Sequence, residues 1–470
     1  MLDEEKRQFS DEKETKSTSD AAGNNPIVIS DEEKRLVRKL DRRILPITCL
    51  LYLFAYLDRT NLGNARLQGL TEENLGGDPT GTLYDWVNSA FFFSYIIFQV
   101  PATITSKLFP PSYWIAGAAV GWGICSTLMA TTFNFGSLMA ARVALGIFEA
   151  GFGPAIPLYF SFFYTRTEMG LRMAYWFGFA AVAGAFGGLI AFGGIPALLL
   201  GVLTFFALPD RPESTRYLNA REKELVMERM NRGTSADIGA VVNKEHIIIA
   251  LLDWRIYTGG MIYFGVNCAL ASISAFLPTI IETFGYTNAL AQLLTVPPYA
   301  VAAIVLCMTS YTSDRIQNRG LAVAGACTVG AIGYLLLLTV PNNVHVRYFA
   351  VFCITSGTYT AIGLIIAWFA HNLGSETKKA TGIPMFMAIG QCGSILGSHI
   401  YPSTDGPRYI SGFAISCGLE AFATVCALVL WVSYKYDNAK RDREYGRPDP
   451  GANVDTSELA DKAPMFRYIA

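Results

Sequence analysis

Long apolar runs recur between Ile44 and Tyr434 and are separated by short polar segments. A helix that crosses a bilayer needs about 20 mostly apolar residues. On that basis the pattern predicts twelve spans, so we expect an all-α membrane protein built as a twelve-helix bundle. The spans are expected to begin near Ile44, Leu83, Trp114, Ser137, Leu171, Ile195, Ile256, Ala289, Leu321, Phe349, Thr381 and Ile410.

A charged segment interrupts the runs after the sixth span. Residues 209–254 include DRPESTRYLNAREKELVMERMNRG, which is typical of a cytoplasmic linker. Asn219, with Glu222 three residues later, predicts the start of an amphipathic helix over residues 220–230. We therefore expect six-helix bundles at residues 44–208 and 255–434, joined by this loop, which is an architecture used by transporters.

Both ends of the chain are polar. Residues 1–43 hold 11 acidic and 10 basic residues, so we expect a disordered tail that lacks the features of a signal peptide. Its last part, SDEEKRLVRKLDRR, predicts a short amphipathic helix on the inner membrane surface. Ser30 is its expected N-cap and Glu33 the capping-box partner. Residues 435–470 are expected to form a second cytoplasmic tail.

Basic residues in the loops predict the orientation. If the N-terminus is cytoplasmic, the inner loops hold 15 Lys and Arg residues and the outer loops hold 3. Both termini are therefore expected in the cytoplasm. We expect the plasma membrane, with a vacuolar or other internal membrane as the alternative.

The fifth and sixth spans share too little sequence. Residues 171–207 provide 37 residues, whereas the matching pair, residues 381–434, has 54. We infer that roughly 20–30 residues near Gly193 and Gly194 are missing from a complete hairpin. The structure should show a stunted sixth span that loses contact with its neighbours, or one broken helix across residues 191–196.

Composition narrows the class of protein further. Charged residues make up 16% of the chain, against about 25% in soluble domains. The net charge of -1 offers no basic field for nucleic acid. The 9 Cys and 4 His have no metal-ligand spacing, and no nucleotide-binding motif or catalytic constellation occurs. We therefore expect neither an enzyme nor a cofactor or metal.

Ionisable residues inside the spans cluster in two places. Asp58 and Arg59, with Asn61 nearby, lie in span one, whereas Arg142 and Glu149 lie seven residues apart on one face of span four. Each charge costs about 2.5–3.5 kcal/mol at a helix centre, so the four should face a cavity or one another. Helix-packing ion pairs without a functional role are the alternative.

Other polar residues in the spans are weaker candidates for lining a cavity. Each of them alone is more often an interhelical hydrogen-bonding residue. They are Asn88, Tyr95, Gln99, Tyr263, Asn267, Tyr359 and Gln391.

Several motifs resemble the allantoate permease family of fungi, in the anion:cation symporter branch of the major facilitator superfamily. They are LDRTNLGNAR, RVALGIFEAGFGPAIP, LPDRPEST, SDRIQNRG, HNLGSETKKA and IYPSTDGPRYISGF, and the resemblance covers about residues 35–440. It implies a major-facilitator-type arrangement of six plus six helices. The chain departs from the pattern in the short hairpin and in SKLFPPSYW, which lacks the superfamily's Asp-Arg signature.

The resemblance implies proton-coupled uptake of a small organic anion or vitamin-like carboxylate by a monomer in the bilayer. The family's proton and anion roles map onto Asp58, Arg59, Arg142 and Glu149. We expect Glu149 and Asp58 to carry protons, and Arg59, Arg142 and Asn61 to bind the substrate. Desolvation near the midplane singles out Glu149 as the main proton carrier. Depth along the two helices predicts that Asp58 pairs with Arg142.

Three alternatives remain open at this point. A proton-antiport exporter of a secondary metabolite would share the fold, although span five lacks the Gly-Pro motif that such antiporters carry. A non-transporting receptor would favour longer and more patterned tails. A transport-impaired variant would follow from the short hairpin.

Overall fold

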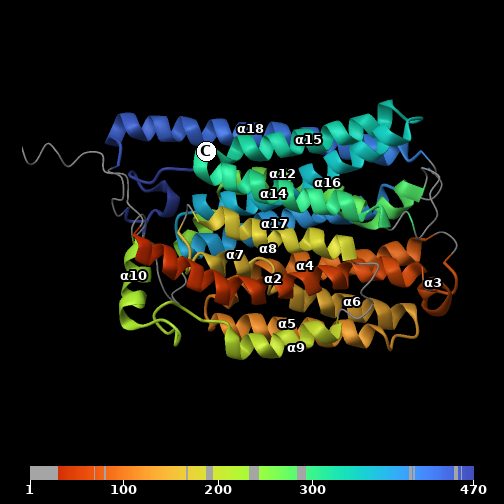
Figure 1. The fold of residues 1–470 in the computed structure, drawn as a ribbon, viewed down its shortest axis with the longest axis horizontal. Helices are drawn as coiled ribbons and strands as arrows, with labels where there is room; N and C mark the ends of the chain where they lie inside the picture. Colours follow the sequence, from red (N-terminus) through yellow and green to blue (C-terminus); the bar gives the residue numbers. More distant parts are fainter. Residues whose placement is uncertain are drawn as a thin grey trace, which may run out of the picture.

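The computed structural model describes residues 30–470 with several gaps. The gaps are residues 68, 79–80, 166–167, 187–193, 232–242, 283–289, 291–292, 402–404, 406–407, 449–453 and 457. The long helices run side by side along the longest axis of the molecule (Figure 1). Helix α10 and the C-terminal segment lie at one end of this array, and α3 lies at the other (Figure 1).

The first half of the chain forms the red-to-yellow part of Figure 1. Its helices are α2 (Asp31–Leu67), α3 (Leu70–Asn74), α4 (Thr82–Ser106), α5 (Pro111–Met129), α6 (Phe135–Ala150), α7 (Ala155–Phe160), α8 (Met169–Phe186) and α9 (Gly194–Ala207). Two shorter helices follow, α10 (Ala220–Asn231) and α11 (Lys244–Leu251).

The second half forms the green-to-blue part. Its helices are α12 (Trp254–Glu282), α14 (Val296–Ile316), α15 (Arg319–Thr339), α16 (Val344–Asn372), α17 (Glu376–His399) and α18 (Ile410–Tyr445). A 3-10 turn at Ala460–Lys462 follows in the C-terminal segment.

The expected twelve-helix fold is confirmed. Among the described residues, 8 helical stretches are long and apolar enough to cross a membrane, and α2, α5, α8 and α9 supply the other four spans. The fourth span is α6 followed by α7, and the chain turns between them at residues 151–154. Pro154 and Pro157 lie at this interruption, as expected of proline in a membrane helix.

Both predicted helix caps are present. The amide of Glu33 donates to Ser30 Oγ at 3.2 Å. Asn219 and Glu222 form a reciprocal pair, because each side chain accepts the other's backbone N–H, at 2.8 and 2.9 Å. The prediction of a separate surface helix before span one is wrong. Helix α2 is continuous over 37 residues, because Leu36, Leu40 and Ile44 extend its buried face without a break.

The described part of the sixth span is short, and because residues 187–193 directly before it lie outside the described residues, the stunted span stays a prediction. Helix α9 has 14 residues and is therefore about 21 Å long, against a hydrocarbon core of about 30 Å. Residues 191–193 of the predicted junction lie outside the described residues. The expected loss of contact is wrong, because α9 packs closely on α5. A Cβ at Gly123 would lie 2.7 Å from Leu198 N, and one at Gly201 would lie 2.9 Å from Val120 N.

Candidate functional site

The two bundles meet along two pairs of antiparallel helices. Helix α4 packs on α17, and Asn88 Nδ2 donates to Ser398 Oγ at 3.0 Å near one end. At the other end Lys107 Nζ donates to Thr377 Oγ1 at 2.8 Å. Helix α8 packs on α14 in the same way. The bundles are therefore in contact near both ends of the interface between α4 and α17, which we call the seam.

An ion pair between α2 and α6 lies in the interior of the first bundle. Arg59 Nε donates to Glu149 Oε1 at 2.6 Å, and a guanidinium NH2 nitrogen contacts the same oxygen. The Glu149 side chain is 1% exposed, and its Oε2 has no partner within the described part of the chain. The Arg59 guanidinium also lies 5.0 Å from the ring centroids of both Phe91 and Tyr95. The ion pair is therefore shielded from water by surrounding side chains. One oxygen of the Glu149 carboxylate makes no hydrogen bond within the described part of the chain.

A second guanidinium lies near the same aromatic ring. Arg142 is buried, and its Cζ is 5.4 Å from the Phe91 centroid. Its Nη2 donates to Asn88 Oδ1 at 3.3 Å. Its Nη1 has no partner among the described residues. Two arginines therefore flank Phe91, and one of them has a free donor.

The predicted pairing of Asp58 with Arg142 is wrong. Asp58 Oδ1 accepts a hydrogen bond from Ser126 Oγ on α5 at 2.7 Å, and the Arg142 contacts are on α4. Successive helical residues point about 100° apart. Once Arg59 faces α6, Asp58 must therefore turn towards α5. Asn61 belongs to α2, but its side chain lies outside the described residues.

Tyrosines also join the bundles through α2, α12 and α16. Tyr56 OH lies 3.0 Å from Ser274 Oγ and 3.3 Å from Tyr359 OH. Tyr359 also packs edge-on against Tyr299, with ring centroids 5.8 Å apart. Tyr359 is among the predicted site residues, whereas Tyr56 is not. The LYLFAYLDR run of span one contains it, one turn before Arg59.

The remaining predicted lining residues are spread over the bundles. Tyr95 OH lies against Gly153, where an added Cβ would be 2.3 Å away, and the Tyr263 ring packs on Gly390 of α17. Gln391 accepts a bond from Ser394 in its own helix at 3.1 Å. Both amide atoms of Gln99 and the Asn267 Nδ2 are buried and without a partner within the described residues.

Sequence reasoning missed one buried carboxyl group. Glu420 in the middle of α18 is 0% exposed, and its Oε1 accepts from Thr358 Oγ1 at 3.2 Å. Its Oε2 has no partner in the described part of the structure. A single Glu in the apolar run after Ile410 is the signal that could have found it. No group of three or more His, Cys, Asp and Glu among the described residues could hold a metal ion.

Comparison with known proteins identifies the family. The family model described as Major Facilitator Superfamily matches residues 48–398. The chain belongs to the Major Facilitator Superfamily. It is an integral, multi-pass membrane protein with the fold of a secondary transporter.

Curated members of the superfamily align with nearly the whole chain. The transporter hxnP of Emericella nidulans is 32% identical over 477 residues, covering 96% of each chain. The high-affinity nicotinic acid transporter of Saccharomyces cerevisiae is 30% identical over 491 residues, covering 99% of this chain and 90% of its own. Both alignments are longer than this chain, so these relatives carry residues that have no counterpart here.

Solved structures show the same fold at low sequence identity. The proton:xylose symporter XylE matches with a TM-score of 0.63 and 14% identity, covering 83% of this chain and 96% of its own. The human organic anion transporter MFSD10 matches with a TM-score of 0.59 and 14% identity, covering 83% and 99%.

Proposed function

We propose that this protein is a proton-coupled symporter that carries a small organic anion, of the vitamin-like carboxylate class, into the cell. The observation that carries the proposal is the buried contact of Arg59 with Glu149 at 2.6 Å. An ion pair inside a membrane protein marks a functional site by default. This pair supplies both a proton acceptor and a cation that a carboxylate can bind.

Coupling follows from competition for one guanidinium. While Glu149 is ionised, it occupies Arg59. A proton on Glu149 removes that negative charge, and Arg59 can then pair with the carboxylate of a substrate. A guanidinium offers a carboxylate two parallel hydrogen bonds. The unpartnered Nη1 of Arg142 is a second donor near the same Phe91 ring. Substrate and proton therefore bind together, because the proton neutralises Glu149 and the substrate carboxylate neutralises Arg59.

Finer assignments belong to the same proposal. The motifs favour the allantoate permease family, and the relative named as a nicotinic acid transporter favours an aromatic or heterocyclic carboxylate as substrate. Asp58, whose Oδ2 is buried without a partner in the described structure, is a second proton acceptor. Asn61 is a further substrate contact. The loop charges favour a location of both termini in the cytoplasm, and the plasma membrane is the proposed location.

Binding and uptake test the proposal separately. The purified protein is heated with nicotinate, allantoate, pantothenate or biotin, and a substrate should raise its melting temperature because it binds only the folded state. Uptake of the radiolabelled hit is then followed in a transporter-deficient yeast, with and without a protonophore. We expect slow accumulation that the protonophore abolishes. Net export of the bound compound, or uptake that ignores the proton gradient, would overturn symport.

A further inference from the structure

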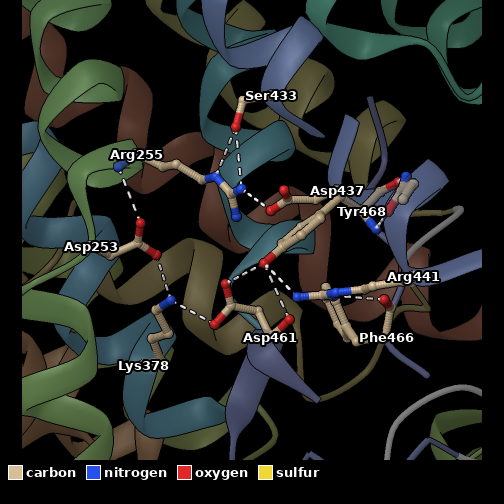
Figure 2. A network of polar contacts seen from close by, with 10 residues as sticks. Asp253, Arg255, Lys378, Ser433, Asp437, Arg441, Asp461, Phe466 and Tyr468 are labelled. Atoms are coloured by element: carbon tan, nitrogen blue, oxygen red, sulfur yellow. Dashed lines mark hydrogen bonds and ion pairs between the residues drawn. The ribbon is translucent and has the colours of Figure 1, made fainter. Parts of the chain in front are cut away.

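We infer that one end of the second bundle is a binding site for a peptide segment, that residues 466–470 of the chain itself occupy it, and that the occupied site steadies the nearby contact between the bundles. The inference stands independently of substrate and coupling. The site lies where α12, α15 and α17 begin and α16 and α18 end (Figures 1 and 2).

Two asparagines bind the backbone of the segment. Asn372 Nδ2 donates to Ile469 O, and Ile469 N–H donates to Asn372 Oδ1, both at 2.9 Å. Asn438 makes the same paired contact with Tyr468, at 2.8 and 2.9 Å. A carboxamide presents one donor and one acceptor side by side, which matches a residue in an extended peptide. Two such pairs on successive residues constitute a site that recognises backbone.

Further donors complete the row of backbone contacts. Trp368 Nε1 donates to Ile469 O at 2.7 Å, and Arg441 Nη1 donates to Phe466 O at 2.8 Å. The first amide of α15, that of Arg319, donates to Ala470 O at 2.6 Å. Because these donors come from α15, α16 and α18, the segment ties together three helices.

Side chains of the segment fill the site. Phe466 is 1% exposed and Tyr468 is 5% exposed. The Tyr468 ring lies 4.7 Å from the Tyr434 ring, and the guanidinium groups of Arg255 and Arg441 approach it at 4.7 and 4.8 Å (Figure 2). Cation–π contacts of this kind strengthen when they are desolvated. The site therefore selects an aromatic residue at position 468 as well as binding the backbone.

A buried lysine connects the bound segment to α17. Lys378 Nζ lies 2.6 Å from Asp461 Oδ1 and 2.6 Å from Asp253 Oδ2 (Figure 2). The Tyr468 hydroxyl donates to Asp461 Oδ2 at 3.0 Å. Residues of the C-terminal segment thus fix the first turn of α17.

The same turn of α17 touches the first bundle. Thr377, which precedes Lys378, accepts the hydrogen bond from Lys107 of the first bundle at 2.8 Å, and Glu376 lies 3.9 Å from the same lysine. Holding this turn in place holds the surface that the first bundle contacts. Release of the segment should therefore loosen the contact at this end of the seam.

Hydrogen exchange of the full-length protein, read by mass spectrometry, tests both parts. Asn372→Ala together with Asn438→Ala removes the backbone pairs. The amides of residues 466–470 are then expected to exchange on the order of tenfold faster or more, and those of residues 376–381 should also accelerate. Lys440→Ala, an exposed change on α18, is the matched control and should leave both segments unchanged.

A second variant, changed within residues 466–470, distinguishes release of the segment from misfolding of the bundle. Phe466→Asp leaves every bundle residue intact and should release the segment to the same extent. Exchange in α5 serves as the check that the fold is retained. Fully exposed exchange of residues 466–470 in the unmodified protein would overturn the site. Release of the segment without any change at residues 376–381 would overturn its effect on the contact between the bundles.

Discussion

Asp58 and Arg59 are neighbours in sequence but face different helices. Arg59 meets Glu149 on α6 at 2.6 Å, whereas Asp58 meets Ser126 on α5 at 2.7 Å. Each carboxylate keeps one oxygen without a partner in the described structure. The two acidic residues of this region thus differ in the cation available to them, and only Glu149 is held by an arginine.

Glu149→Gln should separate exchange from accumulation. The amide keeps the shape of the side chain but cannot release or accept a proton, so Arg59 is permanently freed for the substrate. We expect exchange of labelled for unlabelled substrate across vesicles to persist, while accumulation driven by a proton gradient falls to the level without a gradient. Normal gradient-driven accumulation in this variant would show that another group carries the proton.

Arg59→Lys and Arg142→Lys should both weaken substrate binding despite conserving charge. An ammonium cannot form the paired contact that a guanidinium makes with a carboxylate, so affinity should fall by about tenfold or more. Arg347→Lys at the start of α16 is the control for a conservative change outside the cluster. Titration with the bound carboxylate measures the effect. Unchanged affinity in both variants would show that Arg59 and Arg142 serve only the packing of the helices.

We expect Glu420 to have a structural role that a glutamine at the same position can also fill. Glu420→Ala leaves the Thr358 hydroxyl without its acceptor and opens a cavity. We expect the free energy of unfolding to fall by about 2–4 kcal/mol. Glu420→Gln keeps an acceptor at the same place and should cost less than about 1 kcal/mol. Thermal unfolding in detergent compares the two, and equal melting temperatures would contradict this account.

Among the elements, α9 is the membrane span with the shortest described length. Its 14 described residues extend over about 21 Å, which is about 9 Å less than the thickness of the hydrocarbon core. Mismatch costs only fractions of a kcal/mol per Å, and glycines keep α9 close to α5. A short helix can therefore stay in place against α5, as the predicted shortening of the hairpin would require.

A complete transcript should restore roughly 20–30 residues between α8 and α9, which is the shortfall against two full spans and a turn. Relatives whose alignments run over 477 and 491 residues carry residues without a counterpart in this chain, and the prediction places such residues between α8 and α9. Sequencing the transcript across Phe192–Ile195 is the direct measurement. We expect this chain to transport poorly and the longer one to transport well. Normal uptake by this chain from an identical transcript would refute the prediction.

For the molecule as a whole, the two bundles are joined at both ends of the α4–α17 seam. Asn88 contacts Ser398 at one end, and Lys107 contacts Thr377 at the other. Transport by rocking of two bundles requires the ends to separate in turn. In this structure α4 and α17 are in contact at both ends, so at least one of these contacts must break during such a cycle.

A cross-link at one end of the seam should block the cycle. In a background without the native cysteines, Asn88→Cys with Ser398→Cys should form a disulfide under oxidation that abolishes uptake, and a reductant should restore it. Thr328→Cys with Thr424→Cys is the matched control, since these hydroxyls lie 3.5 Å apart within the second bundle. That pair should leave uptake unchanged. Full uptake while the disulfide between α4 and α17 is intact would exclude rocking at this seam.

The class of protein and the order of its helices could be predicted from the sequence alone. Apolar runs of bilayer length are a local property, so they indicated the spans, and cap residues such as Ser30, Asn219 and Glu222 act within one turn. The shortage of residues for α9 was likewise a matter of counting. The buried charges on α2 and α6 were also visible in sequence, because an ionisable residue in an apolar run is unusual. Glu420 carries the same signal and was missed.

Partners across helices could be decided only by the tertiary structure. Depth along α2 placed Asp58 level with Arg142, but the rotation of α2 about its axis gave the contact with α6 to Arg59 instead. The same holds for Tyr56 with Tyr359, and for Asn438 with Tyr468. Sequence pattern defines which face of a helix is polar or apolar, whereas the packing of neighbouring helices sets the angle at which each face meets its partner. That angle decided which charge is paired and how the C-terminal segment binds.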